Sequence, residues 1–238
     1  MTMTARNATR HKEPWRRRMR LPAYTLRDAA RYARVHPNTV RYWFYGRRKG
    51  TGRNRVRPTL SEKERGAALT YLQLIEVAVV SAMREYVSLS EIRRTHEYMA
   101  QTLSSEFPFA EYRFKTDGVR LMLALDAIEP VSHMSALILT GGGGQETWAE
   151  LVDERLEEFV YEDGDGVAIQ WRVGGSGSNV IIDPRISFGA PMVRGIPTWA
   201  IRGRWRAGES VEDIQGDFML SADEVQEALR FEGVDAAA

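Results

Sequence analysis

Apolar residues recur at helical spacing between positions 25 and 44 and predict two short helices. Thr25 stands where a helix N-cap belongs, because the acidic Asp28 follows three residues later, as in a capping box. Pro37 ends the first helix and suits the first turn of the second, in which Val40 and Trp43 would face inward. Two short helices joined by a tight turn are typical of a helix-turn-helix.

The second helix would turn polar side chains outward, and a glycine-rich basic loop, GRRKGTGRNRVRP at 46–58, follows it. Asn and Arg suit bidentate hydrogen bonds to adenine and guanine edges. The loop has the composition of a wing that contacts the phosphate backbone, although a flexible charged loop would have the same composition. We expect DNA contacts from the following residues: Asn38, Thr39, Arg41, Tyr42, Arg47, Arg48, Lys49, Arg53 and Arg55.

The charge of the chain is divided in the same place. Residues 1–57 hold 17 Arg or Lys against 2 acids, a local net charge of +15, and the remainder of the chain sums to −14. Such asymmetry is a sign of nucleic-acid contact at the basic end. We expect residues 1–20, which are basic and have little to bury, to form a flexible arm that is either a solvated tail or a DNA contact.

Two further apolar stripes, at 61–83 and 88–103, predict longer helices with a core rather than a ligand-binding role. Ser61 with Glu64, and Ser88 with Glu91, have the spacing of capping boxes. The order of helix, helix, basic wing and two helices resembles the MerR-like winged-helix class. The matching phrase is V-x-P-x-T-V-R-Y-W, from Val35 to Trp43.

The sequence pattern in the middle of the chain predicts a small α/β connecting segment over 106–175. A hairpin is expected around Asp117 and Gly118, followed by an acidic amphipathic helix over 146–159. Paired strands are expected at 159–161 and 167–173. The acids between them lack the spacing of an EF-hand, which favours a turn over a calcium site.

The last sixty residues contain the most specific pattern. A D-P-x-x-x-F-G-x-P phrase spans Asp183 to Pro191, and three helical segments follow at 198–207, 210–218 and 221–231. Each segment begins with a residue suited to capping, and Ser210 and Ser221 have an acid three residues later. The chain is therefore expected to be α+β and mainly α, with a winged helix-turn-helix first and a three-helix, helix-turn-helix-like domain last.

This C-terminal block resembles the small antitoxin domain that carries D-P-x-x-x-F-G-x-P, then R-G and a proline, then G-x-S-x-E-x-I-x-x-D-F. The chain departs from that pattern in one spacing, because Ile196-Pro197 stands where the family often has Thr-Arg-Ile-Pro. Residues 21–105 look like the MerR-like half of VapB-type antitoxins. The resemblance implies a DNA-binding domain at 21–105, a connecting segment at 106–175 and a toxin-binding domain at 176–238.

The same resemblance implies the function and the partners. An antitoxin of this type would neutralise a PIN-type, VapC-like ribonuclease toxin and repress its own operon by binding operator DNA. Paired half-sites favour two-fold symmetric readers, so we expect a homodimer or a larger hetero-oligomer with the toxin. The alternative is a MerR-like regulator that responds to a small molecule through residues 106–175.

Two arginines are candidates for contact with the toxin, whose active site would be a cluster of carboxylates around Mg²⁺. A guanidinium can pair with such carboxylates, which suggests Arg185 and Arg194, unless each pairs with a neighbouring acid of its own chain. Phe188 and Trp199 are interface anchors or, alternatively, core residues. The third helix carries Asp223, Glu224 and Glu227, which would repel phosphates, so we expect this domain to contact protein and not DNA.

Several classes of protein are disfavoured. The absence of Cys excludes disulfides, thiolate metal sites and thiol nucleophiles. The four His are scattered, and no metal-ligand spacing or nucleophile elbow is present, so we expect no enzyme activity, cofactor or metal. The most apolar window is too short to span a bilayer, and no signal-peptide core follows the basic start. We expect a cytoplasmic protein without a membrane partner.

Overall fold

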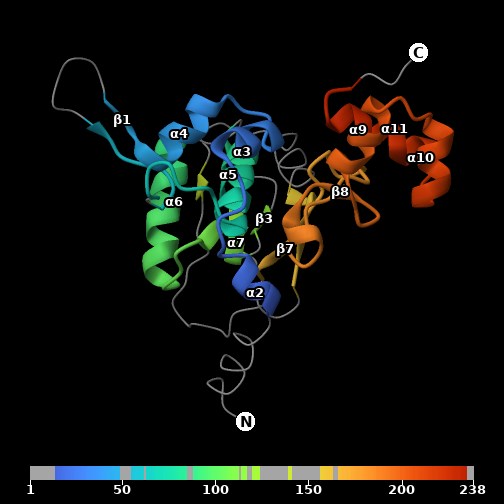
Figure 1. Cartoon of the computed structure of the whole chain (residues 1–238). Helices are drawn as coiled ribbons and strands as arrows, with labels where there is room; N and C mark the ends of the chain where they lie inside the picture. The colour runs from blue at the N-terminus through green and yellow to red at the C-terminus, as the bar shows by residue number, and fades with distance from the viewer. Residues whose placement is uncertain are drawn as a thin grey trace, which may run out of the picture. The chain divides into compact units, whose positions relative to one another are not determined.

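The computed structural model describes residues 14–48, 55–61, 63–84, 88–112, 114–116, 120–123, 139–140, 156–162 and 166–234. Within these ranges the chain combines helices with small antiparallel sheets, as expected for an α+β protein (Figure 1). It divides into two compact units, residues 1–168 and residues 169–238. The finer four-part division expected from the sequence stays a prediction.

The core of unit 1 is the helix α5 (Tyr71–Met83), in which every residue is buried. Helix α3 (Leu26–Tyr32) and helix α7 (Pro108–Glu111) pack against it, and α6 (Leu89–Thr102) packs against α7. A helix that is mostly apolar on every face belongs in an interior. None of the helices in the described ranges is both long and apolar enough to cross a membrane.

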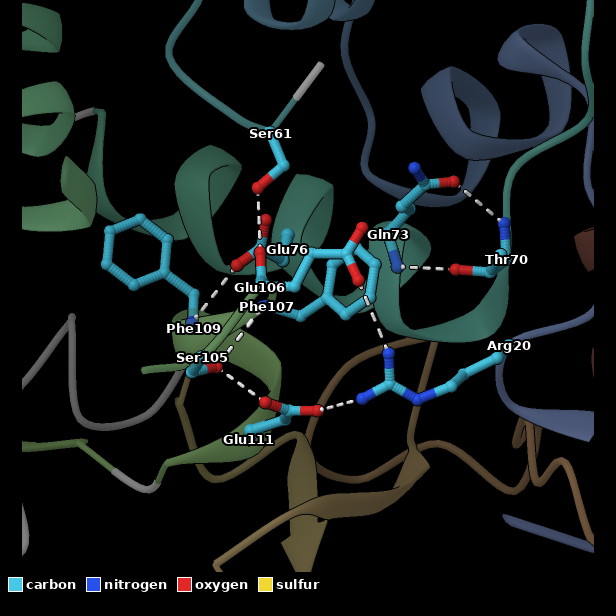
Figure 2. Close-up of polar contacts among 10 residues, drawn as sticks. All are labelled: Arg20, Ser61, Thr70, Gln73, Glu76, Ser105, Glu106, Phe107, Phe109 and Glu111. Carbon is cyan, nitrogen blue, oxygen red and sulfur yellow. Dashed lines mark hydrogen bonds and ion pairs between the residues drawn. The ribbon is translucent and has the colours of Figure 1, made fainter. Parts of the chain in front are cut away.

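The start of α5 corrects one expectation. Its N-cap is Thr70, which forms a capping box with Gln73, and Ser61 does not cap a helix. The Ser61 hydroxyl donates to the Glu106 carbonyl oxygen at 2.7 Å instead, as Figure 2 shows. The backbone of Leu69 pairs with Tyr24 in a β-bridge, so the helix can begin only after that residue.

One buried carboxylate joins α5, α6 and α7. Glu76 lies in α5 and accepts a hydrogen bond from the backbone amide of Phe109 at 3.1 Å (Figure 2). The His96 ring nitrogen Nε2 lies 3.1 Å from both carboxylate oxygens. Burial raises the pKa of Glu76 above its usual value, and His96 opposes that shift. The carboxylate therefore holds three helices in register through buried hydrogen bonds.

The segment expected as a flexible arm is partly folded. Helix α2 (Pro14–Arg18) precedes Met19, which is buried. Arg16 forms an ion pair with Glu162, and Arg20 lies 2.7 Å from a Glu111 oxygen. These arginines therefore contact acids of unit 1, and the expected flexibility remains a prediction only for residues 1–13, which lie outside the described residues.

The middle of the chain follows the expected hairpins where it is described. Strands β3 (Phe114–Thr116) and β4 (Arg120–Leu123) are antiparallel, with Thr116 opposite Leu121. A third strand, β5 (Leu139–Thr140), pairs with β4. Strands β6 (Phe159–Tyr161) and β7 (Ala168–Trp171) form a two-stranded sheet. Most of the acidic helix expected at 146–159 lies outside the described residues.

Unit 2 is built on three helices, α9 (Thr198–Arg206), α10 (Val211–Phe218) and α11 (Ala222–Phe231). They contact one another around a core whose most buried side chains come from all three: Ile201, Ile214, Val225 and Leu229. Ser210 and Ser221 cap α10 and α11 through capping boxes, as predicted. The cap expected for the first helix is wrong, because Thr198 lies inside α9 and donates its hydroxyl proton to Glu232.

Two short strands precede these helices. Strand β8 (Met192–Val193) pairs with β9 (Ile196–Pro197), and Ile181 forms a bridge to Met192. A single 3₁₀ turn, η2 (Ser187–Gly189), lies before β8. These elements hold the D-P-x-x-x-F-G-x-P segment in a defined conformation.

Candidate nucleic-acid and partner interfaces

The helix pair of unit 1 has the predicted local structure. The Thr25 hydroxyl accepts a hydrogen bond from the Asp28 amide, and the Asp28 carboxylate accepts one from the Thr25 amide at 2.9 Å. Helix α4 (Pro37–Tyr45) follows after a tight turn and buries Val40 and Trp43 fully. These contacts fix which face of α4 is turned outward.

The outward face of α4 carries the side chains predicted to read DNA. Asn38, Arg41 and Tyr42 are exposed, and Thr39 is half-buried. The Asn38 amide donates to the His36 ring nitrogen Nδ1 at 3.2 Å, which caps the helix. A short exposed helix with Asn and Arg near its N-terminal end can enter a major groove.

The basic loop forms the paired strands expected of a wing. Strands β1 (Arg47–Arg48) and β2 (Arg55–Val56) are antiparallel, with Arg47 opposite Val56 (Figure 1). The Arg47 guanidinium lies 5.6 Å from the centre of the Tyr42 ring, so the wing and α4 share a cation–π contact. Lys49 and Arg53 lie outside the described residues. The structure thus places Tyr42 of α4 beside Arg47 of the wing.

Gly46 explains why the chain can turn from α4 into the wing. Its φ is 66°, in the left-handed region, and a Cβ at this position would lie 2.1 Å from the Val56 carbonyl oxygen. Glycine is therefore the only residue that fits without a backbone shift. Sequence reasoning noted this glycine only as part of the loop.

In unit 2, Arg185 is paired within its own chain. Its side-chain nitrogens Nε and Nη2 donate to the Asp183 carboxylate at 2.9 and 2.6 Å, and its backbone amide donates to the same carboxylate at 2.8 Å. Asp183 is buried, so this fork closes the turn that the D-P phrase begins. The geometry is that of the structural alternative considered for Arg185.

Arg194 occupies a different setting. Arg194 and Gly195 join β8 to β9 as a two-residue hairpin turn, with φ of 47° and 85°. Positive φ at both positions defines a type I′ turn, which favours Asn-Gly and strains an arginine. The Arg194 side chain is exposed, and its nitrogen Nη1 donates to the Met219 carbonyl oxygen at 3.3 Å. Its guanidinium lies 3.9 Å from Glu224.

Large apolar side chains are exposed on the surface of unit 2, and we call them the exposed apolar set: Ile186, Phe188, Trp199 and Met219. Phe188 is 82% exposed and Trp199 58% exposed, so the core role considered for both is wrong. Met219 is 81% exposed and was not singled out from the sequence. A left-handed residue at the end of a helix is usually glycine. No glycine directly follows α10, and this absence is the sequence signal for Met219 that was missed.

Backbone strain accompanies this exposure. Ser187, Phe188 and Met219 all have φ near 50°, a region that costs non-glycine residues free energy. Residues held in strained conformations cluster at functional sites. Exposed apolar side chains on strained backbone are therefore the feature of unit 2 that needs a functional explanation.

The acidic face expected on α11 is smaller than its sequence suggested. Glu224 accepts the Ser221 amide at 2.7 Å in the capping box. Glu227 accepts hydrogen bonds from the Asn179 amide and from its side-chain nitrogen at 2.9 Å. Asp223 is exposed, so one of the three carboxylates is presented as expected.

Charged groups elsewhere on unit 2 stabilise its surface. The hydrogen bonds that Arg204 donates to Glu209 and Asp217 raise its pKa, and a hydrogen bond donated by Ser210 lowers the pKa of Asp213 below its usual value. Across the described ranges, no three His, Asp or Glu side chains gather closely enough to hold a metal ion.

Comparison with known proteins adds three findings. Residues 180–231 match the model of a family described as "Protein of unknown function (DUF433)". The chain is 25% identical over 227 residues to a Mycobacterium tuberculosis H37Rv protein named "Putative antitoxin VapB45", covering 89% of this chain and 94% of that protein. The crystal structure of Rv2018 from Mycobacterium tuberculosis is similar to this chain with a TM-score of 0.61 at 22% identity, covering 88% of this chain and 98% of the other.

These three matches cover different parts of the chain and support different conclusions. The structural similarity concerns the fold, which extends over most of the chain. The family match concerns only residues 180–231, which run from just before the D-P phrase at Asp183 to the end of α11. The sequence match to VapB45 is the one that bears on function, and it spans both units.

Proposed function

We propose that this chain is an antitoxin that binds a protein toxin through unit 2 and operator DNA through α3, α4 and the wing. The observation that carries the proposal is the exposed apolar set of unit 2, of which Phe188 and Met219 stand on left-handed backbone. The similarity to a protein named as an antitoxin, along nearly the whole length of both chains, supports it.

The toxin surface of unit 2 would combine apolar anchors with one guanidinium. Phe188, Trp199 and Met219 supply the large exposed side chains that dominate binding energy at interfaces. Arg194 is the arginine suited to reach a partner, because its side chain is exposed on a hairpin turn, whereas Arg185 closes its own turn with Asp183. A PIN-type ribonuclease, whose site is a cluster of carboxylates, is the partner this chemistry fits.

The DNA surface of unit 1 would use two kinds of contact. Asn38, Arg41 and Tyr42 face outward on α4 and would contact base edges. The wing would contact phosphates, which position the protein without reading sequence. Repression of the antitoxin's own operon would follow from occupancy of operator DNA, and neither role requires an enzyme activity.

The test is co-expression with a small ribonuclease encoded beside this gene. We expect the full chain to restore growth and to co-purify with the ribonuclease. The Arg194→Asn variant should fold, because Asn suits a type I′ turn, and should lose growth rescue. The matched control is Leu21→Ala, which removes an exposed apolar side chain from unit 1 and should rescue fully. Absence of both rescue and co-purification with the wild-type chain would overturn the antitoxin proposal.

A further inference from the structure

A hollow of about 510 Å³ lies where the turn between α3 and α4 meets the end of α5. Its polar lining comes from Arg34, His36, Thr39 and Arg84, and it also touches Ala33 and Ser81. None of the residues that line it is acidic. The hollow therefore has a positively charged lining and the volume of a small-ligand pocket.

The walls of the hollow are held together. The Ser81 hydroxyl of α5 donates to the Ala33 carbonyl oxygen at the end of α3, at 2.8 Å, and both residues are buried. Arg84 ends α5, and its guanidinium lies 5.9 Å from the centre of the buried Trp43 ring of α4. Three helices thus fix the positions from which the charged side chains extend.

Arg34 has an unusual backbone for an arginine. Its φ is 56°, in the left-handed region, at the turn between α3 and α4, where glycine is common in helix-turn-helix proteins. Glycine or asparagine at this position would relieve the strain. An arginine on strained backbone is the kind of residue that is found where its side chain has a function.

The donors in the hollow suit one chemical group. Each guanidinium presents a planar fork that matches phosphate oxygens, and Thr39 adds a hydroxyl. The His36 nitrogen Nδ1 accepts the Asn38 amide, which leaves Nε2 as the donor of the neutral ring. We propose that this hollow is a phosphate-binding site, filled by a backbone phosphate of bound DNA or by a free phosphate compound. The assignment to a DNA phosphate rests on the operator binding proposed above, whereas the assignment to a free phosphate compound does not.

The first arm of the test measures DNA. The full chain is titrated with a duplex from its own upstream region at several salt concentrations. If the phosphate belongs to DNA, Arg34→Asn and Arg84→Gln should each weaken binding about tenfold, and the salt dependence should lose about one counterion per variant. Arg34→Lys keeps the charge but loses the planar fork, so it should keep the wild-type salt dependence and bind more weakly than the wild-type chain. Arg206→Gln removes an exposed positive charge from unit 2 and should leave the salt dependence unchanged.

The second arm titrates the DNA-free full chain with inorganic phosphate, followed by amide chemical shifts around Arg34 and Arg84. Saturable shifts that disappear in Arg34→Asn, without a change in the DNA salt dependence, would assign the hollow to a free phosphate compound. The inference would be overturned if phosphate caused no saturable shift and if Arg34→Asn and Arg84→Gln both kept the wild-type salt dependence of DNA binding. If the chain binds no DNA at all, the operator proposal fails and the phosphate titration alone decides.

Misfolding is excluded by thermal unfolding of the same proteins. Arg34→Asn should unfold at the same temperature as the wild-type chain or a higher one, because Asn tolerates the left-handed backbone. Loss of phosphate or DNA binding in a protein of undiminished stability would then be a property of the side chain.

Discussion

The α3–α4 pair of unit 1 and the α10–α11 pair of unit 2 are both short helices joined by a tight connection, and each begins with a capping box. Their outward residues differ. Helix α4 presents Asn38 and Arg41, whereas α11 presents Asp223 and directs Glu224 and Glu227 to partners within its own unit. Similar local shapes can therefore serve different partners, because outward side chains and not helix geometry determine what each pair can bind.

A second difference lies in the backbone. The left-handed non-glycine residues of unit 1, within the described ranges, are Arg34 and Ser104. Over residues 169–234, unit 2 has four such residues: Ser187, Phe188, Arg194 and Met219. The described part of unit 2 thus carries more backbone strain than that of unit 1, and such strain is common at functional sites.

The largest expected effect is a loss of DNA binding without a loss of toxin binding, which tests whether the DNA surface of unit 1 and the toxin surface of unit 2 are separate. The double variant Asn38→Ala/Arg41→Ala should weaken operator binding by about 100-fold or more, because each base contact contributes about 1–3 kcal/mol. Fluorescence anisotropy with operator DNA measures this loss. Toxin binding by the same variant should stay at the wild-type level, and an equal loss of both activities would mean that the two surfaces are not separate.

The second-largest effect is expected from a substitution in the toxin surface of unit 2. Phe188→Ala should weaken toxin binding by about 30-fold, because large exposed side chains at interfaces often contribute about 2 kcal/mol or more. Isothermal titration calorimetry against the purified toxin measures it, with Leu21→Ala as the matched exposed apolar control. DNA binding should be unaffected. Wild-type toxin affinity in Phe188→Ala would remove this residue from the interface.

A smaller effect tests whether strain serves binding. Met219→Gly should raise stability by about 1 kcal/mol, because glycine suits a left-handed helix end, and should weaken toxin binding by about tenfold. Thermal unfolding and calorimetry measure the two results. Ser104→Gly relieves the same strain in unit 1 and should leave toxin binding unchanged. A Met219→Gly protein with full affinity would show that the strain has no role in binding.

The smallest effect concerns pH. Hydrogen bonds from Ser210 hold the pKa of Asp213 below its usual value of 3.8, and those from Ser88 do the same for Glu91 in unit 1. A lowered carboxyl pKa stabilises the folded state above the unfolded value and loses that contribution as the pH falls through the folded value. Ser210→Ala and Ser88→Ala should therefore lower the unfolding temperature at pH 7 by a few degrees and by less near pH 3. Calorimetry at both pH values checks this, and equal losses at the two would contradict it.

The local signals in the sequence were accurate for a physical reason. The capping boxes at Thr25, Ser88, Ser210 and Ser221 join residues three positions apart, so the pattern contains the whole interaction. Ser61 and Glu64 have the same spacing, but the capping box predicted there is wrong. The Ser61 hydroxyl instead donates a hydrogen bond to the carbonyl oxygen of Glu106, a residue far along the chain. Short-range spacing cannot reveal such a competing partner.

The surfaces were harder to predict for the same reason. Phe188 was a plausible core residue by composition, but it lies on left-handed backbone and its side chain is exposed. The hollow beside Arg34 depends on Arg84, fifty positions away, and so has no sequence motif. The outward residues of α4 were predictable because Val40 and Trp43 mark the buried face of the same short helix.

Each unit is built from one uninterrupted stretch of chain, and the division falls at the first residues of β7. A single recombination event between two related genes at that point would exchange the whole of unit 2 and leave the coding sequence of α3, α4 and the wing intact. Under the roles proposed above, lineages could in this way change the protein partner of unit 2 in one genetic step and keep the operator DNA that unit 1 would bind.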